Sequence, residues 1–395
     1  MQETIIIVGA GQAGAQVAQS LRQGGFEGPI RLIGDEPYAP YQRPPLSKKF
    51  LLGEIGPEGL WLRPPAFYTT QKIDLIPDTT VVSIDRASKR LEFDNGDTLG
   101  YDKLILTTGT KARSIPLEGA DLDGVMTLRT ITDVDAIRTK LEGKSNLVIV
   151  GAGYIGLEVA AVAKSLGKSV TVVEALDRPM KRVVSPVVSD YFTKLHRAKG
   201  VDLRLNTGVE GFVGEGSVSG VRIAGGDVLP ADLVLVAVGA EPNDGLATAA
   251  GLEVDNGIIV DGCGQTTDEA IYAAGDCTRF FSNRYGRSVR MESVQNAIDQ
   301  AKAVAQALLG EEDVDYDPLP WFWSDQYDIK LQIAGLSDGY DDTKVVGSQD
   351  ANKFYVAYLK DEQLIAVDSI NSPRSHMMAR RTIGEMWRDD LLPEA

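Results

Sequence analysis

The chain contains very little cysteine and histidine. Among its 395 residues the cysteines are Cys263 and Cys277, and the histidines are His196 and His376. Two cysteines cannot build a disulfide scaffold or a cysteine zinc site, and we expect two buried thiols. Two histidines leave almost no material for a metal centre or for histidine general bases, so we expect no bound metal. The chemistry must therefore come from a cofactor.

Long apolar runs and an excess of positive charge are also missing. Nowhere do about eighteen uncharged apolar residues follow one another, and no basic segment precedes a separate apolar stretch at the N-terminus. The formal charge of -16 repels nucleic acid and anionic lipid unless a local basic patch overrides it, and no run of lysines or arginines is that strong. We expect a soluble, cytoplasmic protein that binds no nucleic acid and no membrane.

What the chain does contain is one phosphate-binding fingerprint that occurs twice. The two copies are Gly9-Ala10-Gly11-Gln12-Ala13-Gly14 and Gly151-Ala152-Gly153-Tyr154-Ile155-Gly156. Each follows a short apolar run and leads into a stretch of small residues typical of a helix, which is the context that the fingerprint requires. In such a loop the helix N-terminus holds a pyrophosphate through unpaired N–H groups. Two copies predict two dinucleotide sites.

An acidic residue closes each of these units. Asp35 and Glu174 lie at the end of a second apolar run, about twenty residues beyond the glycine loop, where a carboxylate accepts hydrogen bonds from a ribose. At Glu174 the carboxylate also repels the extra phosphate of NADPH, so NADH is preferred. Arg178 and Lys181 follow closely and could weaken this preference, although solvated loop charges are the more ordinary interpretation.

The two halves of the chain share one plan, which is a glycine loop, an acid, a hairpin and an apolar strand that stops at a glycine. Leu104–Gly109 and Leu233–Gly239 are the two closing strands. We interpret this as an internal duplication with the second copy inserted into the first. The length and the 43% content of apolar residues support several domains. We expect one discontinuous domain of residues 1–113 and 243–318, a second of 114–242 and a third of 319–395.

The third domain is expected to be small and of α+β type. Strands are predicted around Ile329–Ile333, Lys353–Leu359 and Leu364–Ile370, followed by a helix from about Pro373 to Trp387. The predicted fold class is therefore α/β, with two Rossmann-like dinucleotide-binding domains and this C-terminal domain.

Further motifs resemble one family along the whole chain, the FAD-dependent and NADH-dependent ferredoxin reductases that supply bacterial haem monooxygenases and ring-hydroxylating dioxygenases. These motifs are Pro44-Pro45-Leu46-Ser47-Lys48, Trp61-Leu62-Arg63-Pro64, Leu128-Arg129-Thr130, Ala274-Gly275-Asp276, Glu292-Ser293-Val294-Gln295-Asn296-Ala297 and Pro320-Trp321-Phe322-Trp323-Ser324-Asp325-Gln326. The resemblance implies a glutathione-reductase-like architecture with FAD on the first domain, NADH on the second, the flavin ring between them and the third domain over the flavin edge.

The resemblance also implies roles for individual residues. Asp35 would hold the adenosine ribose of FAD, Arg129 and Val82 would lie near its adenine, Asp276 would bond its ribityl chain, and Trp323 would pack near the flavin while its neighbours fill the core. The FAD-binding residues would be Gly9, Gly11, Ala13, Gly14, Asp35, Lys48, Val82, Arg129, Asp276, Val294 and Trp323. The NADH-binding residues would be Gly151, Gly153, Tyr154, Ile155, Gly156, Glu158, Glu174 and Gly239.

Lys48 and Glu158 are the candidate catalytic residues. A hydride that reaches the flavin leaves negative charge on the ring, and an ammonium group at Lys48 would stabilise this charge in a partly dry site. Glu158 resembles the acid that this family places near the nicotinamide. On residue type alone an exposed helix residue is the more ordinary interpretation of Lys48, and for Glu158 the exposed and the functional interpretation are equal.

The expected reaction passes electrons from NADH through FAD to a 2Fe-2S ferredoxin. Thiol chemistry is excluded, because residues 36–60 contain no cysteine where the related disulfide reductases and peroxidases need one. Docking of an acidic ferredoxin on this acidic chain requires a surface patch of positive charge. The candidates for this patch are Arg279, Arg284, Arg287 and Arg290. The alternative is that these arginines belong to an ordinary solvated loop.

Three alternatives remain open at this point. The acceptor could be rubredoxin or a nitrite reductase. The chain could be an apoptosis-inducing-factor-like protein with redox-controlled association, although residues 321–395 leave no room for the long insertion of such proteins. It could also be a degenerate nucleotide-binding module without turnover.

Overall fold

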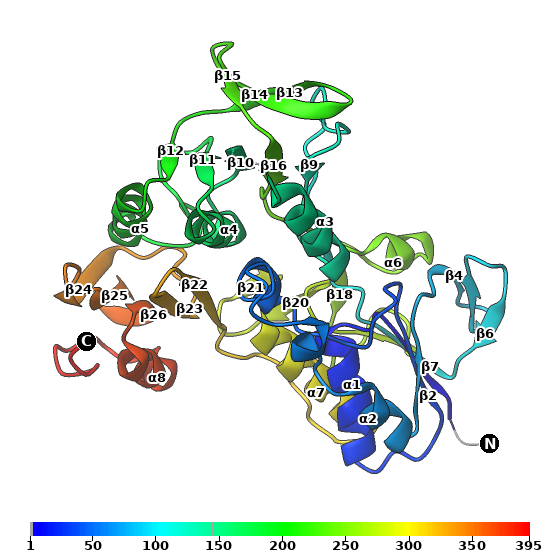
Figure 1. Cartoon of the computed structure of the whole chain (residues 1–395). Coiled ribbons are helices and arrows are strands. Elements are labelled where there is room, and N and C mark those ends of the chain that lie inside the picture. The colour runs from blue at the N-terminus through cyan, green and yellow to red at the C-terminus, as the bar shows by residue number, and fades with distance from the viewer. Residues whose placement is uncertain (1–2, 144–145) are drawn as a thin grey trace. The chain divides into compact units, whose positions relative to one another are not determined.

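The computed structural model of the chain describes residues 3–143 and 146–395 (Figure 1). These residues form two compact units, each assembled from three segments. Unit 1 contains the segment that ends at Gln42 together with Pro57–Lys111 and Ala240–Pro318. Unit 2 contains Arg43–Gly56, Ala112–Gly239 and Leu319–Ala395. Each unit is described by itself below.

The centre of unit 1 is a parallel five-stranded sheet. In spatial order its strands are β19 (Ile271–Ala273), β7 (Lys103–Leu106), β1 (Ile5–Val8), β2 (Ile30–Ile33) and β3 (Ile73–Ile76). Parallel strands need crossover connections, and helix α1 (Gln12–Gln23) supplies the one between β1 and β2. Because both faces of such a sheet are covered, its strands are continuous apolar runs, as all four buried residues of β1 illustrate.

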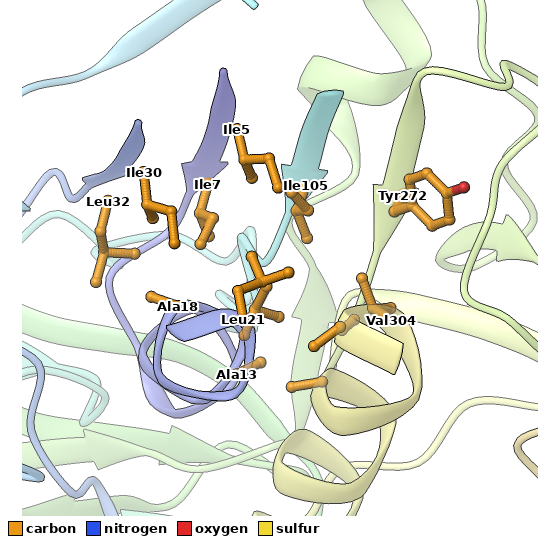
Figure 2. Packing of buried hydrophobic residues seen from close by; sticks show 14 of the residues in the cluster. Ile5, Ile7, Ala13, Ala18, Leu21, Ile30, Leu32, Ile105, Tyr272 and Val304 are labelled. Carbon is orange, nitrogen blue, oxygen red and sulfur yellow. The ribbon is translucent and has the colours of Figure 1, made fainter. Parts of the chain in front are cut away.

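Helices α1 and α7 (Val294–Leu308) lie side by side on one face of this sheet (Figure 2). The sheet residues that project towards Leu21 of α1 are Ile5, Ile7, Ile30 and Leu32. Helix α7 packs on the same core, although it comes from the last segment of unit 1. The buried members of this core are Ile5, Ile7, Ala13, Val17, Ala18, Leu21, Ile30, Leu32, Tyr68, Ile73, Ile105, Tyr272, Ala274, Ala297, Ala301, Val304 and Ala305.

Smaller elements complete unit 1. The helices are η2 (Pro57–Leu60), α2 (Pro65–Thr70) and α6 (Gly245–Ala249). The antiparallel sheet of β4 (Val81–Asp85), β5 (Arg90–Phe93) and β6 (Thr98–Gly100) contains the predicted turn at Asp94–Asp97, where Gly96 has a φ of 83°. The remaining strands are β8 (Thr110–Ala112) with β17 (Ala240–Pro242), and β18 (Ile258–Val260) with β20 (Thr278–Ser282) and β21 (Arg287–Val289).

Unit 2 contains a second parallel sheet. Its strands are β12 (Asp202–Arg204), β11 (Ser169–Val173), β10 (Asn146–Val150), β16 (Leu233–Val236) and β9 (Val125–Met126). The associated helices are η1 (Pro44–Ser47), α3 (Ile131–Leu141), α4 (Tyr154–Ser165) and α5 (Pro186–Ala198). Strands β13 (Val209–Glu215), β14 (Ser217–Ile223) and β15 (Val228–Pro230) form an antiparallel sheet.

The last segment of unit 2 is an antiparallel sheet with one helix. The strand order is β22 (Trp321–Gln326), β23 (Ile329–Gly335), β26 (Gln363–Ile370), β25 (Lys353–Lys360) and β24 (Asp342–Ser348). Helix α8 (Pro373–Thr382) covers the sheet through Ala379, which packs with Val367 and Leu364. The predicted fold class, two Rossmann-like regions with a small α+β C-terminal part, is confirmed.

Some local expectations were wrong. The last helix ends at Thr382 and not at Trp387, because Ile383 is extended and Gly384 adopts a φ of 104°. Helix α3 and strand β24 had no counterpart in the sequence prediction, and Cys263 is only half-buried, although Cys277 is buried. Among residues 3–143 and 146–395 no helix has the length and apolar character needed to cross a bilayer.

A buried aspartate lies in the core of the C-terminal sheet. Asp368 of β26 is 1% exposed and accepts a hydrogen bond from the Tyr358 hydroxyl, which itself accepts one from the Ser185 N–H at 2.8 Å. Burial raises the pKa of the Asp368 carboxyl to about 7, although the bond from Tyr358 acts in the opposite direction. An unfolded aspartate has a pKa of about 3.9. The folded protein therefore holds one more proton between these two values, and stability falls as pH rises through this window.

We expect Asp368→Asn to raise the midpoint of thermal unfolding at pH 8, and to raise it by a clearly smaller amount at pH 5, where only the lower part of the titration window has been passed. The amide keeps an acceptor for Tyr358 and never ionises, and it removes a penalty of up to about 4 kcal/mol, at about 1.4 kcal/mol per pKa unit. Unfolding curves between pH 5 and pH 8 check this. The exposed Asp350→Asn is the matched control in the same domain. A gain that does not vary with pH would contradict the assignment.

Candidate functional site

Each glycine loop connects the middle strand of a parallel sheet to a helix without an N-cap side-chain hydrogen bond. In unit 1 the loop runs from β1 to α1 with Gly11 at the N-cap, and in unit 2 it runs from β10 to α4 with Gly153 at the N-cap. Neither helix has an acidic residue in its first turn. The N–H groups at both helix starts are therefore available to an anion.

The outer glycines of each loop are required by the fold itself. A Cβ at Gly14 would stand 2.1 Å from the Gly9 carbonyl oxygen, and one at Gly156 would stand 2.2 Å from that of Gly151. Gly9 and Gly151 adopt φ angles of 112° and 104°, which other residues rarely adopt.

The middle glycines have a different explanation. A Cβ at Gly11 or Gly153 would meet no protein atom within 4 Å, so the packing of the chain does not require glycine there. A side chain would instead fill the space over the helix N-terminus, where a pyrophosphate approaches the backbone. Gly239 differs from them, because its φ of 110° itself favours glycine, although a Cβ there would also meet no protein atom within 4 Å. Both loops therefore fit a dinucleotide.

Asp35 and Glu174 each lie beside their glycine loop as expected, but their hydrogen bonding and exposure differ. Glu174 accepts hydrogen bonds from the N–H groups of Ala152 at 2.8 Å and Leu176 at 2.9 Å, so its carboxylate is fixed against the second loop. Asp35 is exposed, and the preceding Gly34 lies against Ala10 of the first loop.

Arg178 is neither a solvated charge nor available to a cofactor phosphate. Its guanidinium donates to the Val184 carbonyl at 2.8 Å and to the Ser189 hydroxyl at 2.6 Å, which ties the loop after β11 to helix α5. Lys181 forms a 2.9 Å ion pair with Asp177. Both observations favour the NADH preference that Glu174 predicts.

Lys48 and Glu158 form a buried ion pair inside unit 2. The Lys48 ammonium lies 2.6 Å from Glu158 Oε2, and the side chains are 18% and 4% exposed. Lys48 follows η1, whereas Glu158 lies on α4 one turn after Tyr154. The interpretation of both as exposed helix residues is therefore wrong.

Two serines complete the binding of the Glu158 carboxylate, and neither was identified from the sequence. Ser47 donates to Oε2 at 2.5 Å, and Ser324 of β22 donates to Oε1 at 2.7 Å. Both serines lie in motifs that the sequence analysis quoted, Ser47 in Pro44–Lys48 and Ser324 in Pro320–Gln326. Only the tertiary structure reveals that both bind Glu158.

The aromatic residues of β22 are half-buried. Trp321 and Trp323 stack with their ring centroids 5.8 Å apart, and Phe322 lies 4.8 Å from the Tyr154 ring. The Arg380 guanidinium lies over Trp321 at 4.7 Å. The expectation that Trp321 and Phe322 fill the core is only partly met, because neither is fully buried.

The other predicted cofactor residues divide between the units. Ala13, Val82, Asp276 and Val294 belong to unit 1, and Arg129 and Ile155 belong to unit 2. Val82 and Ile155 are 49% and 42% exposed. Ala13 is buried, Asp276 is half-buried after β19, and Val294 begins α7 behind the Ser293 cap. Arg129 immediately precedes the capping box of α3 formed by Thr130 and Asp133.

The four candidate docking arginines differ in environment. Arg279 lies 3.6 Å from Asp255, and the largely buried Arg290 pairs with Glu292. Arg284 and Arg287 are exposed near Phe281, which is 59% exposed on the same hairpin. Of the four, only Arg284 and Arg287 are exposed on the hairpin that also carries the exposed Phe281.

Comparison with known proteins agrees with this geometry. Residues 3–301 match the family described as "Pyridine nucleotide-disulphide oxidoreductase", and residues 321–391 match "Reductase C-terminal". Rhodocoxin reductase of Rhodococcus erythropolis is 46% identical over 381 residues, which cover 96% of this chain and 89% of that protein.

Two solved structures share the whole fold. The ferredoxin reductase for the CYP199A2 system from Rhodopseudomonas palustris has a TM-score of 0.93 and 44% identity, covering 96% of this chain and 93% of that one. The reductase in the covalent putidaredoxin reductase–putidaredoxin complex has a TM-score of 0.93 and 42% identity, covering 97% and 93%. The chain therefore belongs to the pyridine nucleotide-disulphide oxidoreductase family, in the group of ferredoxin reductases that the sequence motifs indicated.

Proposed function

We propose that this protein is a flavoprotein oxidoreductase that transfers electrons from NADH through FAD to a 2Fe-2S ferredoxin, which in turn supplies a monooxygenase or dioxygenase. The observation that carries the proposal is the pair of strand–loop–helix sites whose middle glycines leave room for a pyrophosphate. FAD, when bound, accepts an electron pair from NADH and releases electrons singly. A cytoplasmic location, where NADH is supplied, is part of the proposal.

The two glycine loops would hold different cofactors. We assign FAD to a domain of residues 1–113 and 243–318, NADH to 114–242, and the cover over the flavin to 319–395. Gly9, Gly11 and Gly14 would hold the FAD pyrophosphate, and Asp35 would hold its ribose. The exposed Val82 would contact the adenine. The remaining FAD contacts would come from Ala13, Lys48, Arg129, Asp276, Val294 and Trp323.

The second loop would hold NADH through the N–H groups at the start of α4. Glu174 would accept hydrogen bonds from the ribose hydroxyls while it holds the Ala152 N–H. Tyr154, Ile155 and Gly239 would line the path towards the nicotinamide. The full loop set is Gly151, Gly153, Tyr154, Ile155 and Gly156.

The Lys48–Glu158 pair would supply the electrostatic part of catalysis. With 18% exposure the Lys48 ammonium is largely removed from water, so its field is weakly screened and can stabilise negative charge on a reduced ring. Glu158, Ser47 and the Pro44 carbonyl restrict the ammonium, because all three accept hydrogen bonds from it. The pair therefore orients a positive charge before the hydride arrives.

Arg284, Arg287 and Phe281 would form the docking site for the ferredoxin. The complex of putidaredoxin reductase with putidaredoxin supports a partner of this class. On a chain of charge -16 a cationic hairpin is a local reversal of sign, and an exposed aromatic residue on the same hairpin is a common interface anchor. Arg279 and Arg290, whose side chains are 26% and 13% exposed, would contribute less. The alternatives of rubredoxin or nitrite reductase electron transfer, and of apoptosis-inducing-factor-like association, are not favoured.

The glycine assignments predict opposite effects for neighbouring substitutions. Gly14→Ala should destabilise the FAD-free protein, because its Cβ clashes with the Gly9 carbonyl. Gly11→Ala should leave that stability unchanged but weaken FAD binding by at least about tenfold, or about 1.4 kcal/mol. Thermal unfolding of the FAD-free protein and flavin fluorescence titration check this. Gly153→Ala is the counterpart that should weaken NADH binding and retain FAD. Unchanged affinity in both middle-glycine variants would refute the assignment.

Replacing Glu174 should shift the nucleotide preference. Glu174→Arg is expected to lower the ratio of kcat/KM for NADH to that for NADPH by about 10- to 100-fold, because a repulsive charge becomes an attractive one. Steady-state kinetics with both nucleotides measure the ratio. Glu174→Gln, which retains an acceptor for one loop N–H, separates the charge effect from loss of loop structure and should shift the ratio less. Unchanged selectivity in Glu174→Arg would refute the role.

Charge reversal at the hairpin should affect only the protein acceptor. The double variant Arg284→Glu and Arg287→Glu is expected to slow ferredoxin reduction by about tenfold or more at low salt and to leave reduction of ferricyanide unchanged. Lys72→Glu with Lys89→Glu, at exposed positions elsewhere in unit 1, is the matched control. Equal losses with both acceptors, or no loss with either, would remove the docking site from this hairpin.

A further inference from the structure

Glu158 is the end of a chain of buried polar side chains that extends away from Lys48. Ser324 donates to Glu158 at 2.7 Å, Gln326 Nε2 lies 3.3 Å from Ser324 Oγ, and Gln326 Oε1 lies 2.8 Å from His196 Nε2. The Tyr327 hydroxyl lies 3.3 Å from His196 Nδ1. We call these five residues the Glu158 chain.

Charge at Glu158 determines the direction of every bond in this chain. The ionised carboxylate beside Lys48 can only accept, so the single hydrogen of Ser324 points to it. Ser324 must then accept from the Gln326 amide N–H, which leaves Gln326 Oε1 to accept from His196. His196 therefore carries its hydrogen on Nε2, and its Nδ1 accepts from Tyr327.

Burial of the Glu158 chain costs free energy unless each of its polar groups has a hydrogen-bond partner. Glu158 is 3% exposed, and Ser324, Gln326 and His196 are 0% exposed. Each unpaired polar group at such depth costs about 1–3 kcal/mol, whereas apolar side chains of similar shape would be nearly neutral. None of these four side chains has an orphaned polar atom. Stability alone does not explain four buried polar residues from α4, β22 and α5.

Tyr327, at the outer end of the Glu158 chain, has a backbone conformation that tyrosine rarely adopts. Tyr327 occupies the turn between β22 and β23 with a φ of 57°, a conformation that favours Gly, Asn or Asp. There its ring lies 5.1 Å from the His196 ring and under the Lys199 ammonium at 5.4 Å. Burial lowers the pKa of His196 to about 4, so the imidazole is neutral at working pH and one tautomer can be fixed.

We propose that Ser324, Gln326 and His196 are positioning residues that hold the Glu158 carboxylate, and through it the Lys48 ammonium, in the orientation needed for flavin reduction. The proposal rests on the proposed function of Lys48 and Glu158. The chain does not conduct protons, because the Gln326 amide has no proton that it releases readily. It acts by orientation, since a displaced charge loses much of its effect on the reacting atoms.

Two pairs of variants test the functional part. Ser324→Ala removes the donor to Glu158 and Ser324→Thr keeps it, whereas His196→Phe removes the donor to Gln326 and His196→Gln keeps it. Anaerobic rapid mixing with NADH should show a limiting rate of flavin reduction that is about tenfold lower in Ser324→Ala and His196→Phe, with an unchanged dissociation constant for NADH. Ser324→Thr and His196→Gln should restore most of the rate. His376→Phe, at the other buried histidine, is the control and should be unaffected.

A second measurement does not depend on activity. The 15N spectrum of the histidine rings should show neutral His196 protonated on Nε2 at pH 7, and Ser324→Ala should produce a mixture of tautomers. His376→Phe leaves His196 as the one remaining histidine signal. Protonation on Nδ1, or a tautomer that does not respond to Ser324→Ala, would overturn the chain. So would a loss of rate in His196→Phe that His196→Gln does not restore.

Lys48→Met separates this proposal from the one on which it rests. If Lys48→Met leaves the rate of flavin reduction unchanged, the proposed role of Lys48 fails. If Lys48→Met slows reduction while Ser324→Ala and His196→Phe do not, the positioning chain alone fails.

Discussion

The constraint on which both nucleotide sites depend is the close passage of backbone over backbone at the outer glycines. At Gly14 and Gly156 a single methyl group would stand within about 2 Å of a carbonyl oxygen of the same loop. This contact places each helix N-terminus directly at the end of its strand. The unpaired N–H groups are thereby concentrated on one point, which is the condition for binding a pyrophosphate without any charged side chain.

The second constraint is the burial of a charge pair inside unit 2. Lys48 comes from a short segment, residues 43–56, that separates from its sequence neighbours to join the second half of the chain. Glu158 comes from α4 and Ser324 from the C-terminal sheet. Because an unpaired charge at this depth is unfavourable, the three segments are held to one arrangement. A buried pair of this kind does not add much stability, but it gives one defined direction to the field of the ammonium.

Family membership and chemistry diverge at one point. The family is described by its pyridine nucleotide and disulphide chemistry, yet residues 36–60 contain no cysteine. The positions near η1 carry Ser47 and Lys48 instead, and these side chains bind a carboxylate. The fold therefore retains the two glycine loops, while residues 36–60 contain a lysine paired with a carboxylate and no thiol.

Local patterns in the sequence determined the fold class, the two glycine loops, the acids at Asp35 and Glu174, and most long strands and helices. These features depend on a few neighbouring residues, because a buried parallel strand, a tight turn and a helix start each have short-range signatures. Helix α3 was missed because its apolar residues are mixed with charges. The helix that starts at Pro373 was extended past Gly384, although that residue adopts a φ of 104° just after the helix ends.

Only the tertiary structure decided which polar groups meet. Ser47, Glu158, Ser324 and His196 are far apart in the chain, and a serine or glutamine has no sequence pattern that names a partner. Their energies depend on distances of a few ångströms and on exclusion of water, and both properties arise when separate elements pack together. Sequence patterns could therefore predict the nucleotide loops, whereas the environment of Lys48 and Glu158 was set by packing.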